Sequence, residues 1–255
     1  MSAFDAAVAA YRACLAAEGA TVDPLRAETH VEAWKDWSTA GTLAEAEAWF
    51  EAQRAANPMR VVDIPLREVA GWHVDPATGN VRHDRGAFFV VHGVRVSNTA
   101  GREVGVGGWD QPMMTQIGFD GGVLGLLRQR RGGVPMYLVE AKAEPGNYQR
   151  VQISPTLQAT FANLERAHRG RRPHFADWFV GTDRAGGQTL WRAWLSEDGG
   201  RLHRKRNLGV LVEAPAGAEI VAPPCFRWMS LWQLKALLDR NAIVNPHIRG
   251  ILAGL

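Results

Sequence analysis

The chain has 255 residues, of which 46% are hydrophobic and 22% are charged, as is ordinary for a globular protein. A net charge of +3 gives no bulk electrostatic attraction for nucleic acid, and no apolar run approaches the roughly 20 residues that cross a bilayer. We therefore expect neither nucleic acid nor a membrane among its partners, and the length allows one large domain or two small ones.

An amphipathic helix is predicted near the start of the chain, because Phe4, Val8, Tyr11 and Leu15 recur at helical spacing behind the potential cap Ser2. Charged residues interrupt this segment and it lacks a basic leader, so it does not resemble an export signal. The two cysteines lie far apart and form neither a metal-binding pattern nor a disulfide framework. Together these features predict a cytoplasmic protein with reduced thiols.

A second helix is predicted from Thr42, which has a capping-box partner in Glu45, to the residues before Asn57-Pro58. We therefore expect an N-terminal helical segment over residues 1–57 and a main unit over residues 58–255. Strand signals, which are β-branched or aromatic residues between turns, open the main unit at 60–64, 71–83 and 88–96.

Two hairpins are predicted further along the chain. Residues 123–130 and 134–143 flank an Arg-Gly-Gly turn, and residues 189–196 and 202–213 flank a Glu-Asp-Gly-Gly turn. Helices thus come first, strands follow, and helices close the chain. This order is typical of an α+β fold and not of regular βαβ alternation.

A helix is predicted between the two hairpins, because Ser154-Pro155 offers a cap and a proline at the first helical position. Leu157, Phe161 and Leu164 would form its apolar face. Two closing helices are predicted to begin at Ser230 and Asn245.

Charged residues stand in the strand that ends at residue 143, where a core strand should be apolar. The alternation of side chains places Met136, Leu138, Glu140, Lys142 and Glu144 on one face. Lys142 would then lie between two carboxylates. Two interpretations remain open, a surface ladder of opposite charges or the wall of a polar cleft.

A dense polar stretch follows this strand. The turn 144–148 leads to Gln152, Ser154, Thr156 and Gln158, which would gather at the N-terminus of the predicted helix. Such an end offers free backbone N–H groups and positive potential to an anion. Capping by Ser154 alone is the simpler alternative, but it accounts for neither glutamine.

Positive charge is concentrated between residues 166 and 206, where ten Lys and Arg residues face four acidic ones. A solvated basic face is one interpretation of this stretch. The other is a phosphate site, because the guanidinium fork of Arg matches phosphate oxygens.

Several of these segments together resemble one known family. Ala141–Asn147 (AKAEPGN) and Val151–Thr160 (VQISPTLQAT) form a long combination of unusual composition. The sequence resembles the NDP-hexose 2,3-dehydratases of deoxysugar biosynthesis over nearly the whole chain. The other shared segments lie at 36–38, 61–72, 78–83, 86–93, 109–112, 163, 168–170, 204–207, 226–228 and 244–245.

The resemblance implies a Nudix-like α+β fold, a mixed β-sheet packed by helices. The Nudix catalytic signature is absent from the sequence, so we do not expect a magnesium-dependent pyrophosphatase. Typical members contain two copies of this unit and the present sequence contains one, which predicts a homodimer. Glu140 stands where the resemblance leads us to expect Gln.

The reaction implied by the resemblance is a β-elimination on a dTDP-linked, or otherwise NDP-linked, 4-keto-6-deoxyhexose. A base takes the C3 proton, the C2 hydroxyl leaves, and a 3,4-diketo sugar results, with no cofactor and no metal. The resemblance suggests Glu144 as the base, Lys142 as the stabiliser of the C4 oxyanion, and His168 as the proton donor. For His168, a structural capping role is the alternative.

The residues expected to bind the substrate divide by chemistry. Amides and hydroxyls would contact the sugar, basic side chains the diphosphate, and an aromatic ring the base, although a tryptophan is as readily a core residue. These expected binding residues are Trp109, Gln111, Asn147, Tyr148, Gln152, Ser154, Thr156, Gln158, Arg169, Arg171, Lys205 and Arg206; Trp228 is a further candidate for stacking.

Three functions remain open from the sequence. The first is an active sugar dehydratase, which the polar groups suited to acid–base chemistry favour. The second is a nucleotide-sugar enzyme of altered chemistry or substrate, which Glu140 and the single copy of the unit favour. The third is a noncatalytic partner subunit, against which the intact set of polar side chains argues.

Overall fold

A computed structural model describes the chain as residues 1–86, 88–97, 107–116, 121–165, 172–181 and 184–255. Three predicted site residues, His168, Arg169 and Arg171, lie outside these ranges. Within the described ranges, no helix is both long enough and apolar enough to cross a membrane.

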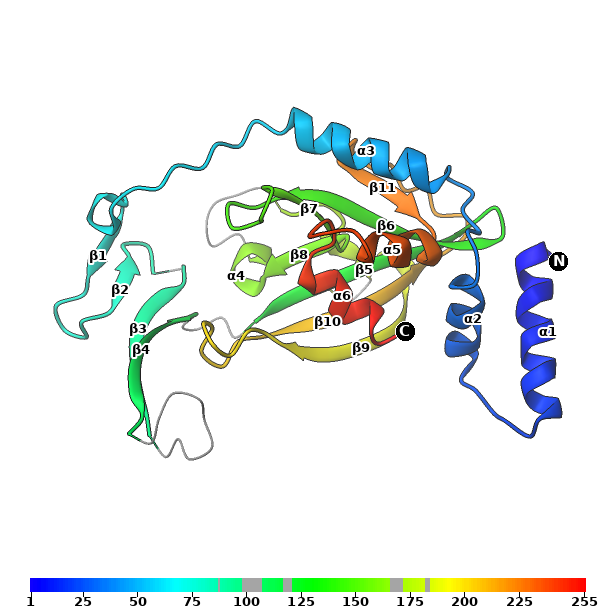
Figure 1. Ribbon diagram of the computed structural model, residues 1–255, viewed down its shortest axis with the longest axis horizontal. Coiled ribbons are helices and arrows are strands. Elements are labelled where there is room, and N and C mark those ends of the chain that lie inside the picture. Colours follow the sequence, from blue (N-terminus) through cyan, green and yellow to red (C-terminus); the bar gives the residue numbers. More distant parts are fainter. Residues whose placement is uncertain (87, 98–106, 117–120, 166–171, 182–183) are drawn as a thin grey trace.

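A mixed seven-stranded sheet forms the centre of the molecule (Figure 1). Strand β10 (Arg206–Ala214) runs parallel to β5 (Gly122–Arg131) and antiparallel to β9 (Gln188–Ser196), which makes the sheet mixed. This arrangement confirms the predicted α+β fold and both predicted hairpins. Its main path has the order β11 (Phe226–Met229), β6 (Val134–Ala143), β5 (Gly122–Arg131), β10 (Arg206–Ala214) and β9 (Gln188–Ser196).

The two long strands β5 and β6 separate halfway along their length. They pair directly from Leu127 opposite Leu138 to the hairpin turn. Beyond that point β7 (Val151–Ser154) pairs with β6, while β8 (Leu157–Thr160) pairs with β5. The chain between residues 151 and 160 therefore forms a wedge that opens the sheet.

A buried threonine stands at the tip of this wedge. The hydroxyl of Thr156 accepts a hydrogen bond from the Leu127 amide at 2.8 Å and donates one to the Leu138 carbonyl. At the point where β5 and β6 separate, the hydroxyl thereby supplies hydrogen-bond partners to one backbone N–H and one backbone carbonyl that no longer pair with each other's strand. Thr156 is thus a structural residue at the junction of the two strands.

The predicted helix from Ser154 is wrong, because residues 151–160 are the two strands of the wedge. Burial alternates along β8 and along the first three residues of β7, the period that a sheet imposes. Pro155 occupies the corner between them, where no ladder bond is needed. Only a single turn follows, helix α4 (Phe161–Leu164), and its cap is Thr160. The sheet pairing of both flanks overrides the local Ser-Pro signal.

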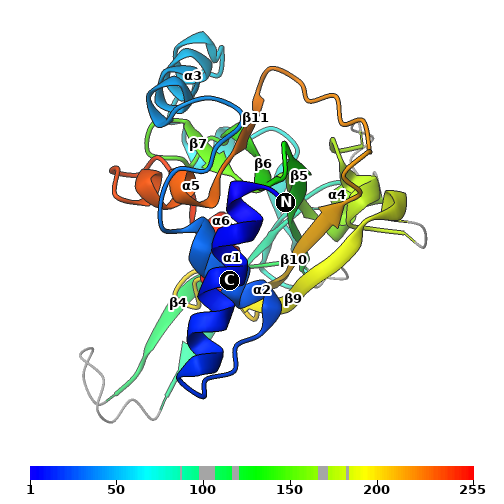
Figure 2. The ribbon, with the colours of Figure 1, turned by 90° about the vertical axis from the view of Figure 1, so that its right-hand side faces the viewer.

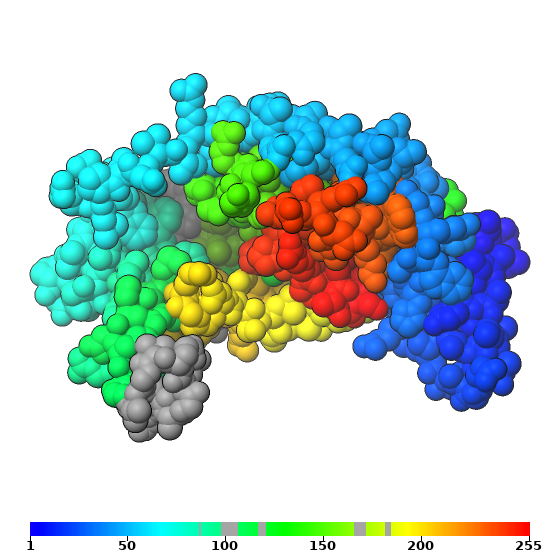
Figure 3. Space-filling model, in the orientation of Figure 1, coloured from blue at the N-terminus to red at the C-terminus, as the bar shows by residue number. Residues whose placement is uncertain are grey.

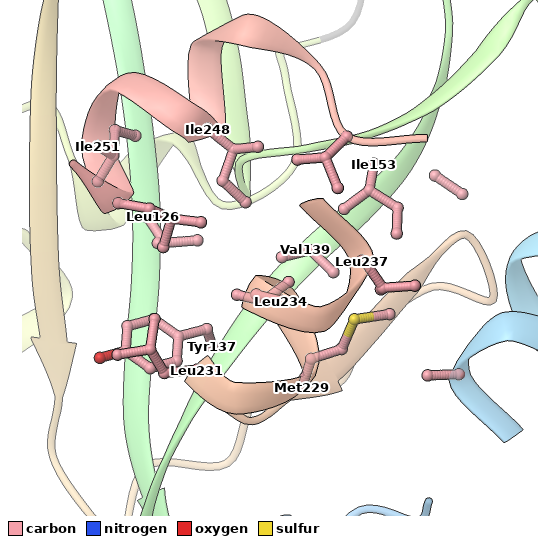
Figure 4. Close-up of a cluster of buried hydrophobic side chains, with 14 of the residues drawn as sticks. Leu126, Tyr137, Val139, Ile153, Met229, Leu231, Leu234, Leu237, Ile248 and Ile251 are labelled. Carbon is pink, nitrogen blue, oxygen red and sulfur yellow. The ribbon is translucent and has the colours of Figure 1, made fainter. Parts of the chain in front are cut away.

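Helices cover one face of the sheet and enclose a core between them. Ile248 and Ile251 of α6 (Pro246–Leu252) pack with Leu234 and Leu237 of α5 (Leu231–Leu238) against strand residues such as Val139 (Figure 4). Ser230 and Asn245 cap these helices as predicted. Helix α3 (Leu43–Ala56), with the predicted capping box, adds Phe50 to the same core.

The other face of the sheet meets the first two helices, α1 (Ala3–Ala17) and α2 (Pro24–Glu32), at one end of the molecule (Figure 2). Phe4 and Val31 are buried in the core of this face. Ser2 caps α1 with a capping box completed by Asp5, as the sequence signal for a helix predicts. Because the N-terminal helices contribute to both cores, the boundary at residue 57 stays a prediction.

A buried ion cluster fastens α2 to the sheet. The Arg128 guanidinium on β5 contacts Glu28 at 2.8 Å, Glu32 at 2.9 Å and Glu213 on β10 at 2.8 Å. Both Arg128 and Glu32 have side chains only 1% exposed. Burial raises the pKa of Glu32 to about 7, although the neighbouring Arg128 lowers it.

Replacing Glu32 by Gln is expected to flatten the dependence of folding stability on pH. Folding raises the pKa of this carboxyl above its ordinary value of 4.5. The raised pKa does not reduce the free energy of unfolding below pH 4.5, and it reduces this free energy by its full amount above pH 7. Between pH 4.5 and pH 8 the free energy of unfolding of the wild type should therefore fall by on the order of 3 kcal/mol, a decrease that the Gln variant should not show. Urea unfolding at several pH values measures this difference, with the exposed Glu18→Gln as control. A variant with the slope of the wild type would contradict the assignment.

A small antiparallel sheet stands beside the main one (Figure 1). Its strands are β1 (Trp72–Val74), β2 (Val81–His83), β3 (Val90–Val96) and β4 (Trp109–Thr115). The backbone of Met114 bonds to Arg201 and His203 in the β9–β10 connection, at 2.8 Å each. The small sheet is thus anchored beside one edge of the main sheet.

An extended arm joins α3 to the small sheet. Residues 60–64, predicted as a strand, belong to no sheet, so this prediction is wrong. The apolar side chains that suggested a strand are exposed here, including Val62 at 78% and Ile64 at 54%. Their pattern predicts a buried partner that the described residues of this chain do not supply.

Candidate functional site

A pocket of about 270 Å³ lies at the open end of the wedge. Figure 3 views the face on which the yellow β9–β10 connection and the red helix α6 border this region. Most of the side chains on its wall are polar. The lining residues are Phe89, Leu124, Glu144, Gln158, Ala159, Thr160, Asn163, Glu197, Leu202, Lys205, Asn207 and His247.

A hydrogen-bonded chain holds Glu144 at this pocket. The Gln158 amide on β8 donates to both oxygens of the Glu144 carboxylate at 3.0 Å. The side-chain amide of Asn245 donates in turn to the side-chain oxygen Oε1 of Gln158 at 3.0 Å. Asn245 is 2% exposed, so the far end of this chain is fixed by the core. The carboxylate therefore has a set orientation before any ligand binds.

The position of Asn245 is itself imposed by the wedge. Its backbone N–H donates to the Ile153 carbonyl at 2.9 Å, and the Ile153 N–H donates to Ile243 at 2.8 Å. The segment between α5 and α6 thus pairs with the free edge of β7. The side-chain oxygen of Asn245 also accepts a hydrogen bond from the Ile248 backbone N–H at 3.1 Å, and Asn245 thereby caps α6.

A second carboxylate of the pocket, Glu197, directly follows strand β9. One oxygen of Glu197 accepts a hydrogen bond from the Asn207 amide and lies 3.5 Å from Nδ1 of His247. Lys205 also lines the pocket, and its ammonium donates to Gln116 at 3.0 Å. The pocket therefore holds two anchored carboxylates, an imidazole and an ammonium.

Glu140 and Lys142 share one face of β6, as the alternation predicts, and their side chains lie 3.4 Å apart. Burial raises the pKa of Glu140, while Lys142 lowers it. Neither side chain lines the pocket. Lys142 is therefore paired with Glu140, whereas Glu144 turns to Gln158 beyond the end of the strand.

Backbone carbonyls accept hydrogen bonds from Asn147, Gln152 and Ser154, three further predicted residues of the 144–158 stretch. The Gln152 amide donates to the Ala242 carbonyl at 2.7 Å, and Ser154 is fully buried. The Asn147 amide donates to the carbonyl of Lys142 and so closes the 144–148 turn. Tyr148 is 84% exposed on that turn and lies outside the pocket lining.

Four further predicted binding residues lie on the small sheet or the β9–β10 hairpin, namely Trp109, Gln111, Lys205 and Arg206. Trp109 donates to Gln111 at 2.6 Å, and Gln111 donates to the Gly200 carbonyl at 2.9 Å. Arg206 lies over the ring of Trp194, 4.3 Å from its centroid. Trp228 is buried in the core, which was the alternative interpretation of its ring.

Of the pocket residues, Glu144, Gln158 and Lys205 were predicted from the sequence. Among those that sequence reasoning missed are Glu197, Asn207 and His247. Glu197 opens a Glu-Asp-Gly-Gly stretch that has the composition of a turn, and this signal hides its carboxylate. His247 follows a helix start and has no local feature that marks it. Only the pairing of β9 with β10 and the docking of α6 bring the three together. Among the described residues, no group of three or more His, Cys, Asp or Glu side chains could hold a metal ion.

The fold and the pocket define an α+β protein whose polar site is equipped for acid–base chemistry on a bound molecule, with two oriented carboxylates that follow different strands. The family model for NDP-hexose 2,3-dehydratase matches residues 43–255. The chain belongs to this family, which confirms the resemblance inferred from its motifs.

Three curated relatives carry the name dTDP-4-dehydro-6-deoxy-alpha-D-glucopyranose 2,3-dehydratase. The protein of Streptomyces violaceoruber is 40% identical over 82% of this chain and 45% of its own length. That of Saccharopolyspora spinosa is 36% identical over 82% and 41%, and that of Amycolatopsis orientalis is 32% identical over 83% and 44%. The chain thus spans less than half the length of these relatives.

A solved structure is also similar to part of the chain. It is a Nudix hydrolase from M. smegmatis, 17% identical, with a TM-score of 0.31 over 53% of this chain and 88% of the hydrolase.

Proposed function

We propose that the chain eliminates the C2 hydroxyl of a nucleotide-linked 4-keto-6-deoxyhexose, as a hydro-lyase. Family membership and the names of the relatives support this substrate class. The observation that carries the proposal is the Glu144 carboxylate, oriented at the pocket by the Gln158–Asn245 chain. An oriented carboxylate in a partly enclosed site is the group that removal of a proton next to a ketone requires.

The elimination divides into two bond changes. The C4 ketone acidifies the C3 proton, which passes to a Glu144 oxygen, and the bonding electrons form an enolate across C3 and C4. The C2–O bond then breaks as the hydroxyl takes up a proton and leaves as water. The product is an enol at C3, which becomes the 3,4-diketo sugar when its hydroxyl proton is lost and C2 gains one.

Negative charge that develops on the C4 oxygen needs a nearby donor. Lys205 lines the pocket, whereas Lys142 is paired with Glu140 outside it, so the placement favours Lys205 for this role. Arg206 beside Trp194 offers a cation and a ring to the diphosphate and the base, close along the chain to Lys205. The roles expected for His168, Arg169 and Arg171 stay predictions, since they lie outside the described residues.

Mass spectrometry after incubation with dTDP-4-keto-6-deoxyglucose tests the proposal. We expect loss of one water from the sugar nucleotide, followed by release of free dTDP from the unstable diketo product. UDP- and GDP-linked 4-keto sugars in parallel reactions identify the nucleotide that is accepted. If binding is seen by thermal shift without loss of water from any of them, a noncatalytic role replaces the proposed one.

We also propose that a second copy of this chain completes the assembly as a homodimer. The relatives are more than twice as long as the segment that matches, and the arm exposes Val62, Ile64 and Leu66 without a partner among the described residues. Burying such an apolar segment against another copy would remove its surface from water.

Val62→Asp is expected to weaken self-association, because a charge at the centre of the arm resists burial. Analytical ultracentrifugation over a range of concentrations should show the mass of two chains for the wild type and a shift toward one for the variant. Val221→Asp is the matched control, since Val221 is equally exposed at 78% but lies outside the arm. A wild type with the mass of one chain at all concentrations would refute the dimer.

A further inference from the structure

The pocket contains a carboxylate–imidazole pair that the removal of the C3 proton does not use. His247 and Glu197 are 23% and 18% exposed, with Nδ1 of the ring 3.5 Å from the carboxylate. Asn207, which is 6% exposed, donates to the same carboxylate oxygen from β10. A carboxylate that holds one ring nitrogen fixes the orientation of an imidazole and leaves Nε2 for the bound molecule.

The pair and the base are tied to each other through one residue. Asn245 caps helix α6, whose second residue is His247, and its amide orients Gln158 and so Glu144. Glu144 follows β6 and His247 belongs to α6, and both line the same 270 Å³ pocket. A molecule that fills this pocket would therefore contact both the carboxylate and the imidazole. Elimination needs both a proton acceptor and a proton donor.

We propose that His247 donates the proton with which the C2 hydroxyl leaves, and that Glu197 is the positioning residue that orients the imidazole. This inference rests on the proposed elimination. In the step, the C2–O bond breaks, its electron pair remains on the oxygen, and the proton moves from Nε2 of His247 to that oxygen to form water. Glu197 takes up no proton in this step and stays beside Nδ1. The C3 proton taken by Glu144 is returned to solvent, from which His247 is reprotonated.

Two half-steps can be followed separately in D₂O. Removal of the C3 proton by Glu144 is reversible when the hydroxyl cannot leave, so unreacted substrate would acquire one deuterium at C3. Departure of the hydroxyl is seen as loss of one water. A variant without the proton donor should therefore exchange the C3 hydrogen of the substrate for deuterium without losing water. A general loss of structure would abolish both reactions.

The experiment compares wild type, His247→Asn, Glu197→Gln and Glu144→Gln with dTDP-4-keto-6-deoxyglucose in D₂O. For His247→Asn we expect elimination to fall about 10³-fold while C3 exchange continues. Glu197→Gln should show the same separation with a smaller loss in kcat and an unchanged KM. Glu144→Gln should lose exchange and elimination together.

His203→Asn is the matched control, because this histidine lies on the β9–β10 connection that also carries Glu197, packs on His92 and does not line the pocket. It should behave as the wild type. If His247→Asn eliminates at the wild-type rate, or binds substrate but loses exchange together with elimination, the assignment of the proton donor is wrong. His247→Gln, checked by thermal unfolding, serves if the Asn variant does not fold. A wild type that neither exchanges nor eliminates would instead overturn the proposed function itself.

Discussion

Glu144→Gln is expected to lower turnover by about 10³-fold, the scale of a lost general base. The carboxamide has the shape of the carboxylate and can still accept one hydrogen bond from Gln158, so the pocket should keep its form. It cannot accept the C3 proton, because an amide is not a base at neutral pH. Steady-state rates of water loss measure the effect, and thermal shift with dTDP checks that nucleotide binding persists.

A neutralised carboxylate elsewhere provides the control for this variant. Glu219 is exposed in the connection between β10 and β11, away from the pocket lining, and Glu219→Gln should keep the wild-type rate. If Glu144→Gln turns over as fast as this control, Glu144 is not the base. Glu197, the other anchored carboxylate of the pocket, would then be the next candidate.

Arg128→Met is expected to destabilise the fold by about 3–5 kcal/mol, because removal of one partner of a buried ion pair leaves uncompensated charge. The methionine retains the aliphatic part of the side chain, but Glu28, Glu32 and Glu213 lose their shared cation. Part of the loss should be recovered at low pH, where burial favours the protonated form of Glu32. Urea unfolding followed by circular dichroism measures the free energy of unfolding.

The same substitution at an exposed ion pair separates burial from charge. Arg95 makes two hydrogen bonds to Asp110, at 2.9 and 2.8 Å, but its side chain is 84% exposed. Arg95→Met should change stability little, since solvent screens such pairs. Equal losses in the two variants would show that the Arg128 cluster does not fasten the N-terminal helices as the structure indicates.

Local signals in the sequence were sufficient for most helices and hairpins. The capping boxes at Ser2 and Thr42 and the glycine turn between β5 and β6 act within a few residues, so the chain shows them directly. Helix α2 was not predicted, although Asp23-Pro24 offers it a cap and a proline at the first helical position. Strand β11 has only four residues and so carries little signal of its own. The wedge was mistaken for a helix because Ser154-Pro155 satisfies the helix-start pattern, and only its pairing with two distant strands decides otherwise.

The candidate site was foreseen only in part for a related reason. Glu144 and Gln158 were selected from the motif, yet their contact depends on the wedge, and its anchor Asn245 comes from the far end of the chain. Composition suggested a ligand role for Thr156, whose hydroxyl is used by two backbone groups of the parting strands. A polar side chain in a motif serves the backbone as readily as a ligand, and the sequence alone does not separate the two uses.

The most direct test of the central claim is the structure of the sugar product formed in D₂O, determined by NMR after the diketone is trapped with an aromatic diamine. The account predicts a sugar that has lost its C2 hydroxyl and carries solvent deuterium at C2, with none of this product formed by Glu144→Gln. A nucleotide sugar recovered from saturating protein with its C2 hydroxyl intact, although bound, would contradict the elimination and the role of this pocket.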